Sequence, residues 1–313
     1  MKSHIESPVE GLLQQFKDHA NSDDYPWLFH YDGGQYDTQL HVSCLIHGDE
    51  TGSLPAAIKV IQKLKNNEIQ YGGRLSITLG NPEAARKGVR YLESDLNRVF
   101  LETDLQTHEA RRAKILMPIF DQADILLDLH QTILKTQTPF YIFPRSNESL
   151  LWAQAMRLTR AFIDATPAAH STTRCADEYF WHQKKPAITV ELSQKGLNPH
   201  AEDLSLMAIR RALGVIEQIQ QGQSIEALAT QSPELHSYRT VYRHPFNREA
   251  CILRPDLHNF ISIEAGECLS APETAEITAP MSGELLFPKY LSTEQLNGET
   301  APPKELFRII QRA

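Results

Sequence analysis

The chain has 313 residues, 41% of them hydrophobic, which suffices for a sizeable core in one large or two unequal domains. It carries 31 Lys and Arg against 39 Asp and Glu, a formal net charge of -8, so no overall positive field favours nucleic acid or an anionic membrane surface. No window approaches the roughly 18 uninterrupted apolar residues of a membrane span, and residues 1–8 contain no apolar core of signal-peptide length. We therefore expect a cytoplasmic protein.

The first part of the chain alternates predicted strands with predicted helices. Apolar residues at helical spacing predict helices over Glu10–Ala20 and Leu54–Leu64, and Asn81-Pro82 begins a short helical piece. Apolar runs predict strands over Tyr25–Phe29, Thr38–Ile46 and Arg74–Gly80. Strand, helix, strand is the order typical of a parallel sheet.

The same alternation continues to residue 221. Helices are predicted over Thr107–Phe120, Glu148–Ile163 and His200–Gln221, and strands over Ala123–His130, Pro139–Phe143 and Pro186–Leu192. The run before His130 is almost continuously apolar, which suits a central strand covered on both faces. These elements predict an α/β domain over residues 1–224.

Beyond residue 225 the pattern changes to short strands separated by turn residues, which predicts a small all-β domain over residues 225–313. Its predicted strands are Tyr238–Tyr242, Ala250–Leu253, Phe260–Ile263, Thr274–Ile277, Gly283–Phe287 and Leu306–Ile310. The four cysteines lie far apart with no Cys-x-x-Cys pair, so we expect reduced thiols rather than a disulfide framework or a zinc ribbon.

Four ionisable residues fall at the ends of predicted sheet strands: His47, Glu50, His130 and Glu191. Ligands gather outside the carboxyl ends of the strands in an open α/β sheet, so these side chains can converge. Two neutral imidazoles and a carboxylate are a common catalytic zinc set, and Glu191 would then act as the base. The competing interpretations are a solvated turn at His47-Gly48-Asp49-Glu50 and a core histidine at His130. Asp49 is not expected to be a ligand.

A short basic segment lies between the predicted strands of this acidic chain. It contains Arg86, Lys87, Arg90 and Arg98. One interpretation is a solvated basic face. The other is a clamp for substrate carboxylates, because arginine recognises a carboxylate with two parallel hydrogen bonds, as lysine cannot.

Several motifs, taken in order, resemble the succinylglutamate desuccinylase and aspartoacylase family, a branch of the zinc carboxypeptidase-like hydrolases. They are His47-x-x-Glu50, Asn81-Pro82 to Arg90-Tyr91, Asp95-Leu96-Asn97-Arg98, Asp128-Leu129-His130 and Glu191 within a strand. The resemblance covers about residues 38–200, and the C-terminal β segment fits more loosely. It implies a mixed, largely parallel central sheet flanked by helices, with the small C-terminal β domain capping the active site.

The resemblance also implies a role for each residue. It makes His47, Glu50 and His130 the ligands of one Zn2+ per chain, and Glu191 the general base and acid. Arg90 matches the arginine that polarises the scissile carbonyl, and Asn97 and Arg98 match the pair that holds the α-carboxylate of the substrate. Asp95 matches a carboxylate bonded to the first zinc histidine, a contact that fixes the ring.

A second Asp-Leu-His triplet, Asp256-Leu257-His258, competes with the one that ends in His130. We favour His130 because an apolar central strand precedes it, whereas His258 lies in a turn leading into an edge-type strand. The segments from Asp128 to Thr132 and Pro139 to Pro144, together with Asn259-Phe260, resemble the desuccinylase branch.

The expected reaction is hydrolysis of a small anionic substrate, N-succinylglutamate, to succinate and glutamate, as in arginine catabolism. Three alternatives stay open: an aspartoacylase or another N-acyl amino acid amidohydrolase, a carboxypeptidase acting on peptides, and a non-catalytic metabolite-binding protein. Tyr290 is a candidate to enter the site from the β domain, against its interpretation as a surface aromatic. Assembly into a homo-oligomer is also left open.

Overall fold

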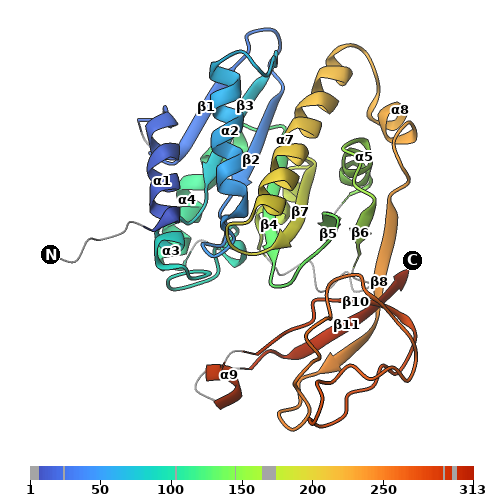
Figure 1. Ribbon diagram of the computed structural model, residues 1–313. Coiled ribbons are helices and arrows are strands. Elements are labelled where there is room, and N and C mark those ends of the chain that lie inside the picture. The colour runs from blue at the N-terminus through green and yellow to red at the C-terminus, as the bar shows by residue number, and fades with distance from the viewer. Residues whose placement is uncertain are drawn as a thin grey trace, which may run out of the picture.

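One mixed β-sheet runs through the whole molecule in the computed structural model (Figure 1), which describes residues 7–23, 25–102, 104–144, 146–163, 174–291, 293–297 and 302–313. Within these residues the strand order is β1-β3-β2-β4-β7-β5-β6-β8-β11-β10-β9. Helices flank the N-terminal part of the sheet, and the C-terminal part consists of strands and loops with one short helix. The predicted α/β class with a mixed, largely parallel sheet and C-terminal strands is confirmed.

The strands that position the site lie in the middle of the sheet. The N-terminal strands are β1 (Leu28–Asp32), β2 (Gln39–Cys44), β3 (Arg74–Leu79), β4 (Ile125–Thr132), β5 (Phe140–Ile142), β6 (Arg160–Phe162) and β7 (Ala187–Gln194). β3, β2, β4 and β7 pair in parallel, while β1 and β5 pair antiparallel to their neighbours β3 and β7. Every residue of β2 and β4 is buried, because helices cover both faces of the sheet there.

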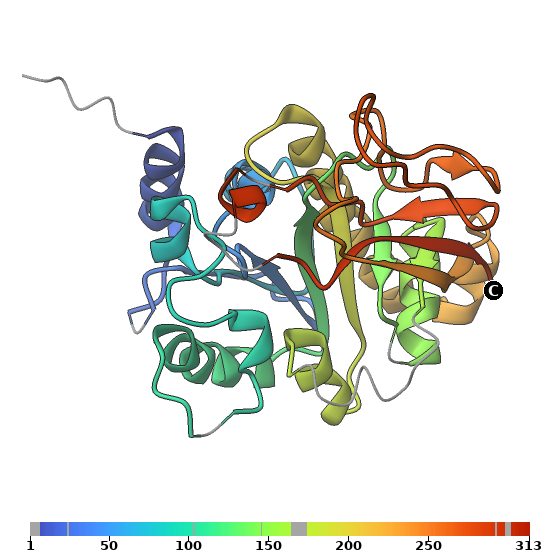
Figure 2. The same ribbon diagram turned by 90° about the horizontal axis from the view of Figure 1, so that it is seen from below.

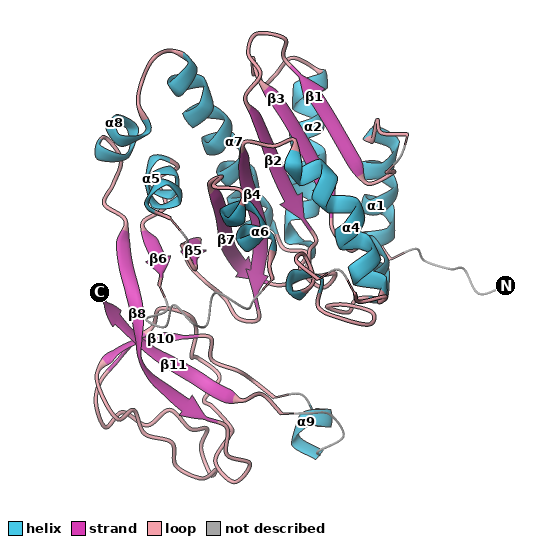
Figure 3. Ribbon diagram, turned by 180° about the vertical axis from the view of Figure 1, so that it is seen from behind, coloured by secondary structure: helices cyan, strands magenta, loops and turns pink. Residues whose placement is uncertain are grey.

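Two layers of helices cover these strands. α1 (Pro8–His19), α2 (Leu54–Lys65) and α7 (Pro199–Gln220) lie on the face shown in Figure 1, and α4 (His108–Asp121) and α6 (Ala176–His182) on the face shown in Figure 3. The remaining described helices of this part are α3 (Pro82–Lys87), α5 (Asn147–Ala155), α8 (Ile225–Thr230) and two short 3-10 helices, η1 (Thr51–Ser53) and η2 (Leu96–Arg98). α4 and α7 begin at polar caps, Thr107 and Asn198, whose side chains accept a backbone N–H of the first turn. None of the described helices combines the length and apolar character needed to cross a bilayer.

The helix predicted over Glu148–Ile163 is wrong in its second half. α5 ends at Ala155, and residues 160–162 form strand β6, which pairs in parallel with β5 and β8. The chain reverses at Arg157, whose φ of 59° lies in the left-handed region, and the N–H of Leu158 bonds back to the carbonyl of Ala153. This turn is the hydrogen-bonded ending typical of a helix C-terminus, here without the usual glycine.

The C-terminal segment, residues 236–313 and here called the β module, continues the sheet. Its strands are β8 (His236–Pro245), β9 (Ser262–Ile263), β10 (Gly283–Leu286) and β11 (Glu305–Arg312), and α9 (Thr293–Asn297) precedes β11. The strands predicted at Ala250–Leu253 and Thr274–Ile277 are wrong. Ala250 and Leu253 make only isolated bridges, and Cys251, Leu253 and Ile277 are buried in a separate apolar cluster without forming a continuous ladder.

The β module lies beyond the carboxyl ends of the parallel strands. In Figure 1 the arrowheads of β4 and β7 point toward it, and the view from below in Figure 2 has it in front of those strands. The edge of the sheet where a doubly covered α/β fold collects its ligands therefore faces the β module.

Candidate active site

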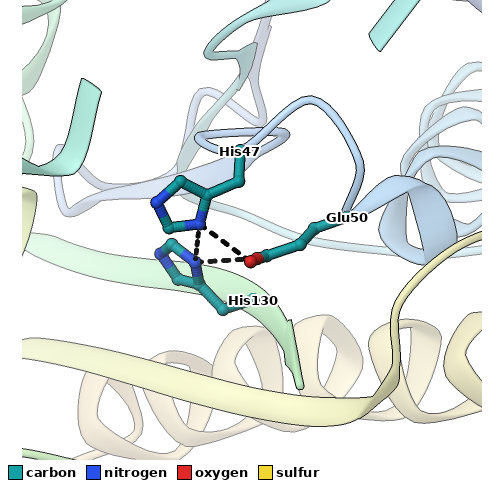
Figure 4. Close-up of side chains that lie close together, drawn as sticks. All are labelled: His47, Glu50 and His130. Carbon is teal, nitrogen blue, oxygen red and sulfur yellow. Dashed lines mark hydrogen bonds and ion pairs between the residues drawn. The ribbon is translucent and has the colours of Figure 1, made fainter. Parts of the chain in front are cut away.

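Two histidines and a glutamate meet at this edge of the sheet (Figure 4). The Nδ1 atoms of His47 and His130 are 3.2 Å apart, Glu50 Oε1 lies 2.8 Å from Nδ1 of His47, and Glu50 Oε2 lies 2.9 Å from Nδ1 of His130. All three side chains are buried. Among the described residues this is the group of three or more metal-type ligands whose donor atoms lie within 4.8 Å of one another.

A turn after β2 aims His47 and Glu50 at this point. β2 ends at Cys44, two residues before the predicted end, because Leu45 takes a φ of 55° and turns the chain out of the sheet. Gly48 then packs directly on α3, where a Cβ atom would lie 2.4 Å from the backbone of Ala84, so only glycine fits. The N–H of Gly48 also donates to the carbonyl of Arg90 at 2.9 Å. This hydrogen bond joins the turn that carries His47 and Glu50 to the segment that carries Arg90.

Each histidine has a carboxylate on its outer nitrogen. Nε2 of His47 lies 3.1 Å from Oδ1 of Asp95, and Nε2 of His130 lies 2.8 Å from Oδ2 of Asp128. A proton held on Nε2 by a carboxylate leaves the Nδ1 lone pair for a metal ion. Asp128 is a residue that the sequence reasoning missed. Its signal was available, because residues two apart on a strand face the same side and the motif reads Asp128-Leu129-His130.

The donor types fit Zn2+, which binds imidazole nitrogen and carboxylate oxygen. Burial alone would raise the pKa of Glu50, but the adjacent imidazoles of His47 and His130 hold that pKa well below its ordinary value. The carboxylate is therefore ionised between the two Nδ1 atoms. Its Oε2 also accepts the backbone N–H of Gln131 at 3.0 Å, which fixes its orientation.

Glu191 lies beside this cluster on β7, directly opposite His130 in the parallel register of β4 and β7. Its Oε2 is buried and makes no hydrogen bond with any described residue. Burial, followed by repulsion from the Glu50 carboxylate, raises the pKa of Glu191 to about 7. A carboxyl group that titrates near neutral pH and has no competing partner is suited to accept and return a proton.

The predicted arginines and asparagine also reach the cluster. Arg90 donates to Glu50 Oε1 at 3.2 Å and to Asp95 Oδ2 at 3.3 Å, and its Nη2 lies 2.8 Å from Nε2 of His47. Arg90 can donate only to an unprotonated Nε2 of His47, whereas Asp95 can accept only from a protonated Nε2, so the two contacts require opposite tautomers. A cation bound at Nδ1 would favour the tautomer with the proton on Nε2, which donates to Asp95. Nδ2 of Asn97 lies 3.5 Å from Nε2 of His130, and Arg98 donates to the Asn97 carbonyl at 2.6 Å.

These residues line a cavity of about 160 Å3, here called the metal-site cavity. It brings together His47, Arg90, Asn97, Arg98, His130 and Glu191 with Ile142, Phe143, Cys175, Asp177, Thr189 and Phe287. The second set was not predicted. Only Thr189 had a local signal, since it precedes Glu191 by two residues on the same strand and so faces the same side.

Two other candidates lie away from this cavity. The hydroxyl of Tyr290 donates to the backbone carbonyls of Arg254 and Leu257 inside the β module. Nδ1 of His258 lies 3.0 Å from the carbonyl oxygen of Asn259. Neither residue lines the metal-site cavity, so it is His130 that the fold brings to His47 and Glu50.

The fold and this cluster place the chain in the class of mixed α/β proteins that carry a metal-type site at the carboxyl edge of the sheet. Residues 36–213 match the family profile described as the succinylglutamate desuccinylase/aspartoacylase catalytic domain. Because the match spans more than half of the chain, the chain belongs to this family of hydrolases, which confirms the resemblance seen in the motifs.

Individual relatives agree with this assignment. A succinylglutamate desuccinylase of Pseudomonas paraeruginosa is 25% identical over 267 residues, which cover 80% of this chain and 79% of the relative. The solved structure of a succinylglutamate desuccinylase/aspartoacylase from Rhodobacter sphaeroides has a TM-score of 0.69 at 14% identity, covering 91% of this chain and 89% of that one. A desuccinylase structure from Chromobacterium violaceum has a TM-score of 0.64 at 18% identity, with 96% and 98% covered. These structures share the fold.

Proposed function

We propose that this protein is a zinc-dependent amidohydrolase that cleaves N-succinylglutamate to succinate and glutamate. Membership of the family supports the reaction class, and the similarity to the succinylglutamate desuccinylase of Pseudomonas paraeruginosa supports the succinyl substrate. The observation that carries the proposal is the buried Oε2 of Glu191, which makes no hydrogen bond with any described residue and adjoins a His-Glu-His cluster.

Nδ1 of His47, Nδ1 of His130 and the carboxylate of Glu50 would hold the ion. A bound Zn2+ supplies Lewis acidity, which lowers the pKa of a water molecule and polarises the amide carbonyl. Asp95 and Asp128 keep both rings in the tautomer and orientation that this binding needs.

Glu191 moves the proton in this mechanism. Its carboxylate accepts a proton from the water that attacks the acyl carbon, and it returns that proton to the amine as the C–N bond breaks. Its pKa of about 7 suits both steps, because the carboxylate that accepts the proton and the carboxyl group that returns it are both well populated at neutral pH. Arg90 donates to the carbonyl oxygen as negative charge develops there.

Asn97 and Arg98 would bind the α-carboxylate of the amino acid. The side-chain oxygen of Asn97 accepts the N–H of Ala176 at 2.9 Å, so its amide group is held in one orientation with Nδ2 toward His130. Arg98 is exposed and lines the cavity, where its guanidinium can pair with a carboxylate through two parallel hydrogen bonds.

The test is a substrate panel on protein of measured zinc content. N-succinylglutamate, N-acetylglutamate, N-acetylaspartate and a tripeptide are compared by kcat/KM, and activity should disappear on chelation and return with Zn2+. The highest kcat/KM is expected for N-succinylglutamate. Faster cleavage of N-acetylaspartate would indicate an aspartoacylase, tripeptide cleavage a carboxypeptidase, and binding without turnover in zinc-loaded protein a non-catalytic role.

A further inference from the structure

A second cavity, of about 320 Å3 and here called the β-module pocket, adjoins the metal-site cavity. Arg90, Arg98 and Phe287 line both cavities, so a molecule in one can extend into the other. One wall of the pocket comes from the end of β4, and the other comes from the β module. The wall from the β module contributes Lys289, Glu305 and Arg308 among others.

The described lining of the β-module pocket is strongly basic. Arg90, Arg98, Lys289 and Arg308 face it, with Glu305 as the acidic residue. Glu305 is shared among cations: Arg308 Nε lies 2.7 Å from its Oε1, Arg243 Nη1 3.2 Å from its Oε2, and Lys289 Nζ 3.8 Å from Oε1. The positive side chains that line this pocket repel one another although the protein as a whole has a net charge of -8. A bound anion would offset this repulsion.

Lys289 is the cation whose place is most specific to this pocket. Its side chain is only 25% exposed, and its Nζ donates to the backbone carbonyl of Glu305 at 3.1 Å. Burial, reinforced by Arg308 and opposed by Glu305, lowers the pKa of Lys289. An ammonium group has three donors, so a ligand carboxylate can bind in addition to Glu305. Such a ligand would also offset the cost of burying the charge.

The backbone beside Lys289 is held in a costly conformation. Phe287 has a φ of 51° and precedes Pro288, a position where proline disfavours anything but extended backbone. Asn259 fixes this turn, because its Oδ1 accepts the N–H of Phe287 at 2.8 Å and its own side chain is buried. The turn sends Lys289 to the pocket and Tyr290 into the β module. Strain of this kind concentrates at binding sites.

We propose that the β-module pocket binds a substrate carboxylate remote from the scissile amide, with Lys289 as its main ligand. The pocket thereby selects N-acyl amino acids that carry a carboxylate beyond the α-carboxylate. N-succinylglutamate has two such groups, one on the acyl chain and one on the glutamate side chain. The proposal rests on the proposed function and deepens it, since it assigns substrate selectivity to the β module.

The experiment compares Lys289→Met with Arg243→Met on three substrates. Arg243 is the matched control, because it also pairs with Glu305 but does not line the pocket. N-butanoylglutamate lacks the acyl carboxylate of N-succinylglutamate, and N-succinylnorvaline lacks the side-chain carboxylate. Zinc content and thermal unfolding of each variant are measured first, and Lys289→Gln replaces Lys289→Met if the latter does not fold.

Lys289→Met should lower kcat/KM for N-succinylglutamate by about 10- to 100-fold, mainly through KM, as expected for loss of one charge-assisted hydrogen bond. The substrate that lacks the bound carboxylate should lose less than about threefold, and this identifies which carboxylate occupies the pocket. Lys289→Arg should restore part of the loss, and Arg243→Met should change little.

An equal loss on all three substrates, or the same loss in Arg243→Met, would overturn the proposal. Unchanged kinetics of Lys289→Met would do so as well, while leaving the proposed function intact. Failure of the zinc-loaded wild-type protein to cleave any N-acyl amino acid would instead remove the proposed function, so the two failures are distinguishable.

Discussion

Replacing Glu109 by glutamine should destabilise the protein at the segment that carries Arg90. Glu109 lies in the first turn of α4 and is fully buried. Its Oε1 accepts the N–H of Leu92 at 2.6 Å and the side-chain amide of Asn81 at 3.0 Å. Its Oε2 accepts the N–H groups of Glu93 and Ser94 at 3.1 and 3.0 Å. One carboxylate thus holds three consecutive backbone amides.

The size of the effect follows from these contacts. Each carboxylate oxygen of Glu109 accepts two N–H groups, and glutamine replaces one of these oxygens by an NH2 group that cannot accept. Two N–H donors therefore lose their acceptor. A buried unsatisfied donor costs about 1–3 kcal/mol, so the variant should lose about 2–6 kcal/mol of unfolding free energy. Turnover should fall too, because residues 92–94 connect Arg90 to Asp95, and these two side chains contact Glu50 and His47 of the His-Glu-His cluster.

The assay is urea unfolding of Glu109→Gln and of a matched variant, Glu10→Gln. The carboxylate of Glu10 pairs with Arg86 at 2.8 Å, and both side chains are 36% exposed. Removing one charge there should cost less than about 1 kcal/mol, as is usual for surface ion pairs. If Glu109→Gln unfolds within about 0.5 kcal/mol of the wild type, a value typical of neutral surface changes, the carboxylate does not hold this segment and the reasoning fails.

The pH dependence provides an independent check of the same residue. Burial works to raise the pKa of Glu109, but the N–H of Leu92, the amide of Asn81 and the other donors hold it below its ordinary value. A carboxyl with a depressed folded pKa contributes stability above the unfolded pKa of about 4.3, and this contribution is lost as the pH falls through the folded pKa. The stability gap between wild type and Glu109→Gln should therefore shrink on acidification below about pH 4. A gap independent of pH would contradict the assignment.

Three further substitutions test the site itself. Glu191→Gln should keep its zinc but lose about 10²-fold or more in kcat, since general acid-base catalysis contributes about 10²- to 10⁴-fold; unchanged turnover would remove Glu191 from the mechanism. His130→Ala should lose zinc and His258→Ala should retain it, as measured by metal analysis of the purified variants. Retention of zinc by His130→Ala would mean that the ion binds elsewhere.

The His-Glu-His cluster was predictable because two simple rules combine there. Apolar runs located β2, β4 and β7 with end errors of two residues at most, and the topology of parallel strands brings their carboxyl ends to one edge. His47, Glu50 and His130 therefore met as expected although they come from distant segments. The resemblance to the family implied roles for Arg90, Asn97 and Arg98, which lie in a segment whose spacing alone left two interpretations.

Other features depend on contacts that no local pattern records. The end of α5 at Ala155 comes from a left-handed residue that is not glycine, so the usual helix stop signal was missing. The short segment after it joins the sheet only because β5 and β8 lie on either side. In the β module, short runs between turn residues suggested strands at Ala250–Leu253 and Thr274–Ile277, where the structure has isolated bridges and buried apolar residues, since such runs report burial and not pairing.

The β module shows how local sequence can identify a segment but not its active side chain. Tyr290 was the candidate to enter the site from the β domain, yet the left-handed turn at Phe287 directs Tyr290 into the module and Lys289 to the β-module pocket. Lys289 gave no local signal, because its proposed role depends on Arg98, which lines the same pocket and comes from the other part of the chain. Positive side chains that come together from distant segments in a protein of net charge -8 are visible only in the fold, and the proposed selectivity for a second substrate carboxylate rests on them.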